Sequence, residues 1–177
     1  MGKYIIAVLV VILAVLVFTF TRRGSAEAAK MEETMDAIFQ RNARAFGVDW
    51  RLVKAIAIVE SSLNPAAVNA ADRESVGLMQ VLCQPDGKGG CRNRFPAVVG
   101  WSGATREKLL QPDFNVYIGA QIIATNLRDY GSIPKAVAVY NAWDQRNAPR
   151  AGPFKNQRYV DKVIGEFVDM GGDAWPV

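Results

Sequence analysis

The stretch WRLVKAIAIVESSLNP, Trp50–Pro65, decides the fold class of this chain. Seven of the eight residues from Leu52 to Val59 are apolar, and Lys54 is the exception. This pattern predicts a helix that is buried on most of its sides. Asp49 is the predicted N-cap, and we expect the helix to end before Asn64-Pro65 because a residue that precedes proline avoids helical geometry.

Glu60 lies at the C-terminal end of this apolar helix. Apolar surroundings and the negative end of the helix dipole both disfavour ionisation, so we expect its pKa to be raised. A glycosidase needs a carboxyl group that is still protonated near neutral pH, because this group protonates the leaving oxygen. The alternative interpretation is a solvated glutamate in the last helical turn with no chemical role.

The rest of the chain predicts a mainly α domain at residues 25–177. Residues 66–103 are mostly irregular, and because sustained two-residue alternation is absent from the sequence, any sheet must be small. Apolar periodicity predicts four further helices. The first is built on Met31, Met35, Ile38, Phe39 and Phe46 and is ended by Gly47, and the second runs from about Asp113 to Tyr130 and is stopped by Gly131. The third is KAVAVYNAW (135–143), with Ser132 as N-cap and Pro134 in its first turn, and the fourth runs from about Asn156 to Met170.

The N-terminal residues 1–24 have a different character. Tyr4–Thr21, YIIAVLVVILAVLVFTFT, carries no charge, and a helix of this length would be roughly 27 Å long, close to the thickness of a bilayer's hydrocarbon core. The pattern predicts a single transmembrane anchor. A cleaved signal peptide is the alternative, because Ala26-Glu27-Ala28 offers a cleavage site of the A-x-A type.

The charges beside this segment do not set its orientation. Lys3 precedes it, whereas Arg22 and Arg23 follow it, so the positive-inside rule is near balance and even favours a cytoplasmic C-terminal domain. The function inferred below overrides this balance. We therefore expect a single-pass protein of the inner membrane with its catalytic domain in the periplasm.

Composition excludes several classes of function. The net charge of +4 falls to +1 without Lys3, Arg22 and Arg23, which leaves 18 basic and 17 acidic residues and no dense basic run, so nucleic-acid binding is not expected. The absence of histidine excludes Ser-His-Asp machinery and most zinc sites, and we expect neither metal nor cofactor.

Cys83 and Cys91 enclose the glycine-rich loop CQPDGKGGC, which favours a structural disulfide in an oxidising compartment.

Several short motifs occur in a fixed order along the chain. Their sequences are ESSLNP (60–65), GLMQ (77–80), DFNVYIG (113–119), AVYNA (138–142) and Tyr159-Val160 with Val163. This set resembles the soluble lytic transglycosylase family, whose pattern is E-S-x-x-N-P, then G-L-M-Q, A-Y-N-A and a final Y-V-x-x-V helix. The resemblance extends from about Asp49 to Phe167.

The resemblance implies a helical, lysozyme-like fold that acts on the glycan strands of peptidoglycan without a metal. It implies that Glu60 is the catalytic acid and base. Met79 and Gln80 match residues that line the sugar cleft beneath it. Tyr140 and Asn141 match a pair that faces the glutamate and orients both the N-acetylmuramic acid and the catalytic carboxyl.

Three positions depart from the family pattern. Asn69 lies where the family usually carries a serine, and because the segment from Glu60 to Gly77 is about two residues longer than usual, Ser75 is the alternative for that role. Trp143 replaces the glycine that ends the A-Y-N-A-G motif. These changes bear on the fit of the substrate more than on the reaction.

A single carboxyl group predicts a transglycosylase. Glycosidases commonly use two carboxyl groups, but one suffices if the nucleophile belongs to the substrate, as when the muramoyl C6 hydroxyl closes a 1,6-anhydro ring. If Asp72 or Glu74 were a second carboxylate that activates water, the enzyme would be a hydrolase, a muramidase similar to goose-type lysozymes. A non-catalytic wall-binding subunit is a further alternative. A transglycosylase, a muramidase and a wall-binding subunit could each belong to a secretion machine or a phage.

Overall fold

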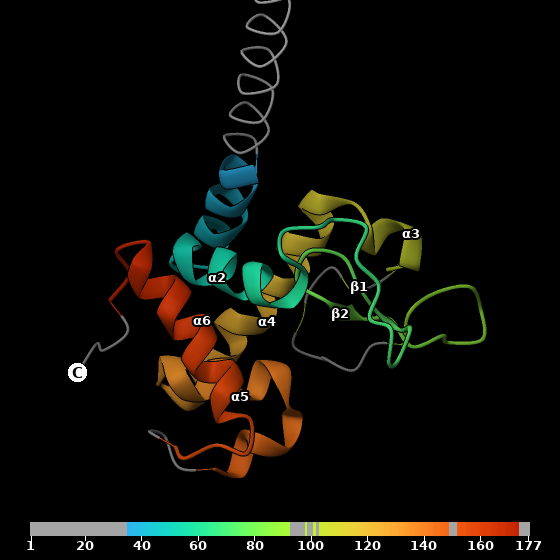
Figure 1. Ribbon diagram of the computed structural model, residues 1–177. Helices are drawn as coiled ribbons and strands as arrows, with labels where there is room; N and C mark the ends of the chain where they lie inside the picture. Colours follow the sequence, from blue (N-terminus) through green and yellow to red (C-terminus); the bar gives the residue numbers. More distant parts are fainter. Residues whose placement is uncertain (1–34, 93–97, 99–100, 102, 149–151, 174–177) are drawn as a thin grey trace, which may run out of the picture. The chain divides into compact units, whose positions relative to one another are not determined.

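The computed structural model describes residues 35–92, 98, 101, 103–148 and 152–173. The chain divides into a unit of residues 1–37 and a unit of residues 38–177, and the second unit contains every helix and strand from α2 onward (Figure 1). The predicted anchor, Tyr4–Thr21, lies outside the described residues. Within the described part of the chain, no helix has the length and apolarity that crossing a bilayer requires.

Helix α2 spans Trp50–Ser61 and confirms the prediction for this stretch. The side chain of Asp49 accepts a hydrogen bond from the backbone N–H of Arg51, as an N-cap does. Residues 52–57 are buried, and Ser62 and Leu63 then adopt φ values of 53° and 60°. Two consecutive non-glycine residues in the left-handed region turn the chain sharply, so α2 ends directly after Glu60.

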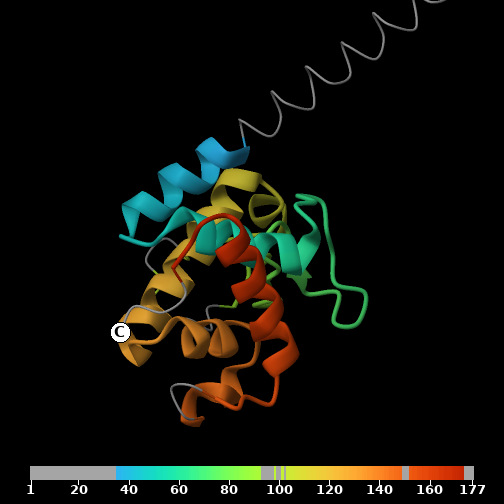
Figure 2. The same cartoon turned by 60° about the vertical axis from the view of Figure 1, so that its left-hand side comes forward.

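Six further helices belong to the described residues. They are a helix that ends at residue 45, α3 (Arg106–Leu109), α4 (Pro112–Tyr130), α5 (Ile133–Asn141), the 3₁₀ helix η1 (Trp143–Asn147) and α6 (Gln157–Asp169). Helix α2 packs against α6, α4 packs against α5, and α5 also contacts α6. Figures 1 and 2 show α6, in red, beside α2 in both views.

Helix α4 contacts α5, α2 and α3. Its buried residues include Val116, Ile118, Ile122 and Ile123 and also the polar Asn115, Gln121 and Asn126. Gly131 ends it with a φ of 59°, a conformation that glycine adopts without strain, as the sequence predicted.

Two helices, α3 and α5, differ from the predictions. Helix α3 was not predicted, because four residues are too few to show a helical period. Helix α5 ends at Asn141, two residues before the predicted end, because Ala142 is extended and η1 follows. Ser132 precedes α5 as predicted, but its side chain makes no capping hydrogen bond.

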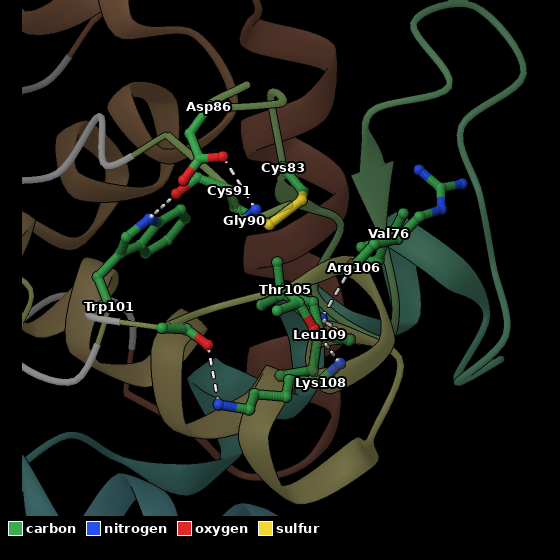
Figure 3. The surroundings of a disulfide bond; sticks show 12 residues. Val76, Cys83, Asp86, Gly90, Cys91, Trp101, Thr105, Arg106, Lys108 and Leu109 are labelled. Atoms are coloured by element: carbon green, nitrogen blue, oxygen red, sulfur yellow. Dashed lines mark hydrogen bonds between the residues drawn. A yellow bond between two sulfur atoms is a disulfide. The ribbon is translucent and has the colours of Figure 1, made fainter. Parts of the chain in front are cut away.

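The irregular region contains one small hairpin. Strands β1 (Ser75–Val76) and β2 (Val81–Leu82) are antiparallel, with Ser75 opposite Leu82, and the GLMQ segment forms the turn between them. Cys83 follows β2 directly and forms a disulfide with Cys91, which confirms the predicted bridge. Beside it, the indole N–H of Trp101 donates to the Cys91 carbonyl at 3.0 Å (Figure 3). The disulfide loop is therefore attached to the end of the hairpin.

Candidate active site

A cavity of about 300 Å³ lies where the helices meet the hairpin. One wall of the cavity consists of helices and the other of an irregular loop with the small hairpin. The helical wall consists of Glu60 of α2, Ile122 of α4 and Val139, Tyr140 and Asn141 of α5. The loop wall comes from the segment between α2 and α3 and consists of Asn69, Asp72, Ser75, Gln80, Val81 and Leu82.

Glu60 is the acidic group of the helical wall. Burial raises the pKa of its carboxyl from the ordinary value of 4.5 to about 7, although a hydrogen bond from Tyr159 lowers it in part. Each pKa unit corresponds to about 1.4 kcal/mol, so the surroundings disfavour the ionised form by about 3 kcal/mol. A carboxyl group with such a pKa can bind and release a proton near neutral pH, and Glu60 lines the cavity.

Two phenols accompany this carboxyl group. The Tyr159 hydroxyl, from the first turn of α6, donates a hydrogen bond of 2.7 Å to Glu60 Oε1. The Tyr140 hydroxyl donates instead to the Met79 carbonyl at 2.8 Å. Burial and the charge of Glu60 raise the pKa of both phenols well above the ordinary value, so both remain protonated donors.

The GLMQ turn is held in place by Asn115 of α4. This fully buried side chain accepts a hydrogen bond from the Met79 N–H at 2.7 Å and donates to the carbonyls of Val76 and Leu109 at 2.9 and 2.7 Å. Gly77 lies against it, because a Cβ added there would come within 2.2 Å of Asn115 Nδ2. One buried amide thus fixes the turn that leads into the loop wall.

Gly119, one turn after Asn115, receives the side chain of Met79. A Cβ at Gly119 would lie 2.2 Å from the Met79 sulfur, so only glycine leaves room for this contact. The Met79 side chain is fully buried and is not part of the cavity wall. In this structure Met79 therefore contributes through its backbone, which differs from its expected place in the sugar cleft.

Asp72 is the second carboxylate of the cavity. Although burial acts to raise its pKa, hydrogen bonds from Ser75 and from the backbone N–H of Glu74 outweigh that effect and hold the pKa below its ordinary value. The Ser75 hydroxyl donates to Asp72 Oδ2 at 2.7 Å, and the N–H groups of Glu74 and Ser75 donate to Oδ1 at 2.9 Å. Asp72 is therefore an anion at neutral pH, whereas Glu60 is partly neutral.

The structure brings together most of the residues predicted for the site. Glu60, Asn69, Ser75, Gln80, Tyr140 and Asn141 all line one cavity. Asn69 and Ser75, the two candidates for the family's serine, lie on the same wall, and the Asn69 N–H donates to the Ser75 carbonyl at 3.0 Å.

Other roles were not predicted. Tyr159 appeared in the sequence only as part of the final motif, yet its phenol donates to Glu60, whereas that of Tyr140 donates to the Met79 carbonyl. Asn115 and Gly119 belong to the DFNVYIG motif, and their spacing of four residues, which places them on one helical face, is the signal that could have indicated a shared role.

Among the described residues, no group of three or more Asp, Glu or Cys side chains is arranged to hold an ion. The chemistry that the cavity offers is proton transfer by Glu60, supported by phenols and amides.

Two comparisons with known proteins give the family and the fold of the chain. The family model for the transglycosylase SLT domain matches residues 37–158. The chain belongs to the transglycosylase SLT domain family. A solved structure of an inactive mutant of the lytic transglycosylase Slt from Pseudomonas aeruginosa superposes with a TM-score of 0.58 and 23% sequence identity.

That similarity covers 76% of this chain but only 23% of the Pseudomonas protein. It shows that this SLT domain has the mainly helical, lysozyme-like transglycosylase fold. The order of the motifs therefore identified both the family and the fold correctly.

Proposed function

We propose that this chain is a peptidoglycan lytic transglycosylase in which Glu60 acts first as acid and then as base. The observation that carries the proposal is the raised pKa of about 7 for a carboxyl group that faces the cavity. Such a group can hold a proton at neutral pH and can also take one back. Membership of the SLT domain family supports the substrate class.

The reaction needs no water. Glu60 gives its proton to the oxygen that links C1 of N-acetylmuramic acid to N-acetylglucosamine, and the C1–O bond breaks. The muramoyl C6 hydroxyl then bonds to C1 and gives its proton to Glu60, which restores the acid and leaves a 1,6-anhydro ring. An intramolecular hydroxyl has a high effective concentration, which replaces the second carboxylate of ordinary glycosidases.

Tyr159 and the loop wall assist this cycle. The hydrogen bond from Tyr159 holds one carboxylate oxygen, so the other oxygen remains available for the proton transfer. It also stabilises the ionised form that exists between the two proton transfers. The anionic Asp72 on the loop wall would favour a sugar ring on which positive charge develops.

A muramidase is the second candidate, because Asp72 lines the same cavity as Glu60. As a base it could activate water, and the enzyme would then be a hydrolase. The hydrogen bonds from Ser75 and Glu74 argue against this role, because they lower the basicity of Asp72.

Mass analysis of the products from purified sacculi tests both candidates. The proposal predicts muropeptides that end in 1,6-anhydro rings. Reducing ends that carry an added water would identify a muramidase. Binding to sacculi without any release of fragments, equal for the native chain and for Glu60→Gln, would identify a non-catalytic wall-binding subunit.

We further propose that the domain works in the periplasm, tethered by the segment at residues 4–21. The Cys83–Cys91 disulfide supports an oxidising compartment. Protease added to spheroplasts should degrade the domain while a cytoplasmic marker stays intact. Protection of the domain until the membrane is lysed would contradict this location.

A further inference from the structure

The amide of Asn156 lies behind the helical wall, directly before α6. Its Nδ2 donates two hydrogen bonds, to the Ala138 carbonyl at 2.9 Å and to Asn141 Oδ1 at 3.0 Å. Both acceptors belong to α5, which contacts α6 (Figure 1). Asn156 therefore joins the start of one helix to the C-terminal end of the other.

These two bonds determine which way both amides face. A backbone carbonyl can only accept, so Asn156 must turn its NH₂ group, and not its oxygen, toward Ala138. The second hydrogen of that NH₂ group points to Asn141, which must then present its oxygen. The alternative orientation of Asn156 would place its oxygen against the Ala138 carbonyl.

Asn156 affects the cavity because it orients the side-chain amide of Asn141. With Oδ1 occupied by Asn156, Asn141 keeps its Nδ2 as its remaining polar group, and no hydrogen bond of that nitrogen occurs among the described residues. Because Asn141 lines the cavity, its free NH₂ is a donor for a ligand. An amide that could rotate freely would offer a donor or an acceptor with equal ease.

We propose that Asn156 is a positioning residue that makes Asn141 a donor and thereby selects a carbonyl-type oxygen on the bound sugar. Such an oxygen belongs either to an acetamido group or to the lactyl group of a muramoyl residue. This inference rests on the proposed function of the cavity. The first turn of α6 then orients both polar partners of the helical wall, since Tyr159, three residues later, holds Glu60.

The test replaces Asn156 in the full chain and measures kcat/KM on soluble, uncrosslinked glycan strands. In Asn156→Asp, a carboxylate cannot donate, so Asn141 should rotate to donate to it and present an oxygen to the cavity. We expect kcat/KM to fall at least tenfold, mainly through KM, because two acceptors would then face each other. Asn156→Ala removes the donor without adding a charge, and we expect a smaller loss of about threefold.

A double-mutant cycle separates positioning from folding. In the background of Asn141→Ala, the change Asn156→Asp should have no further effect on kcat/KM, because its influence passes through Asn141. Thermal unfolding is recorded for every variant. If Asn156→Asp does not fold, the Ala variant in the same two backgrounds completes the test.

Binding to the inactive Glu60→Gln chain identifies the selected oxygen. A tetramer of N-acetylglucosamine carries only acetamido carbonyls, whereas the glycan strands also carry lactyl groups. A loss of affinity for both probes on Asn156→Asp would indicate the acetamido group, and a loss for the strands alone would indicate the lactyl group.

The inference and the proposed function fail in different ways. A native chain that does not cleave the strands would refute the function. A native chain that cleaves them, with Asn156 variants within twofold of it or with equal losses in both Asn141 backgrounds, would refute the positioning role alone.

Discussion

Two carboxyl groups line the same cavity and have opposite properties. Glu60 ends an apolar helix, and burial raises its pKa to about 7. Asp72 lies in an exposed loop, where hydrogen bonds from Ser75 and Glu74 overcome the effect of burial and lower its pKa. Two carboxyl groups of the same chemistry thus become an acid and, at neutral pH, an anion.

The difference teaches that the backbone around a carboxyl group determines its protonation state. The C-terminal end of a helix presents carbonyl groups, not N–H groups, and among the described residues the hydrogen bond to Glu60 comes from a phenol. The loop instead directs free N–H groups toward Asp72. Environments that separate two pKa values assign the roles of acid and anion.

The largest expected effect comes from exchanging each carboxylate for its amide. Glu60→Gln removes the proton donor and should lower kcat by about 10²–10⁴-fold on sacculi. Asp72→Asn keeps the shape of the loop wall and should lower kcat by less than about tenfold, because Asp72 transfers no proton. Turbidity clearing measures both rates, and equal losses would show that the site uses two carboxylates.

The next effect is on stability as a function of pH. Glu60 has a raised pKa in the folded state, so the folded state binds more protons than the unfolded state between pH 4.5 and 7. Raising the pH through this window should therefore destabilise the native chain by about 3 kcal/mol relative to Glu60→Gln. For Asp72 the sign is opposite, since its stabilisation is present above the ordinary pKa and is lost as the pH falls.

Urea unfolding at a series of pH values tests this contrast. The stability of Glu60→Gln and that of the native chain should coincide near pH 4 and diverge toward pH 8. A constant difference across this range would mean that Glu60 titrates normally.

The disulfide should affect the loop wall more than the helical wall. Replacing Cys83 and Cys91 together by serine removes a bridge that closes a short loop, and we expect a loss of about 2–3 kcal/mol in the free energy of unfolding. Because Cys83 directly follows β2, the affinity for glycan strands should also fall. The pKa of Glu60 should stay near 7, and a shift would show that the two walls are coupled.

The smallest effect is expected from removing the Tyr159 hydroxyl that donates to Glu60. Tyr159→Phe removes one hydrogen bond to the carboxyl, so kcat should fall by about five- to tenfold. Since that bond lowers the pKa of Glu60, its loss should move the basic limb of the pH–rate profile to higher pH. Tyr140→Phe is the matched control, because its hydroxyl bonds to Met79 and its loss should leave that limb nearly unchanged.

The sequence predicted the local features of this site well. Helix α2, its Asp49 cap and the place of Glu60 followed from apolar periodicity and from Asn64-Pro65, which act within a few residues. The disulfide followed from two cysteines around a short glycine-rich loop.

The features that the sequence did not predict depend on distant contacts or on the conformation of an irregular loop. Tyr159 and Glu60 are 99 residues apart, and the sequence indicated Tyr159 only as part of the final motif. Met79 was expected in the cleft because it matches a cleft residue of the family that the motifs resemble, but the turn directs its side chain to Gly119. The hydrogen bonds that make Asp72 an anion depend on the loop's conformation, which no sequence period indicates.

The central claim is that Glu60 holds a proton near neutral pH, and a direct titration tests it. The carboxyl carbon of Glu60, labelled with ¹³C and assigned by comparison with Glu60→Gln, is followed by NMR from pH 3 to 9. We expect a midpoint of about 7. A midpoint near the ordinary value of 4.5 would contradict it, because the site would then lack its acid.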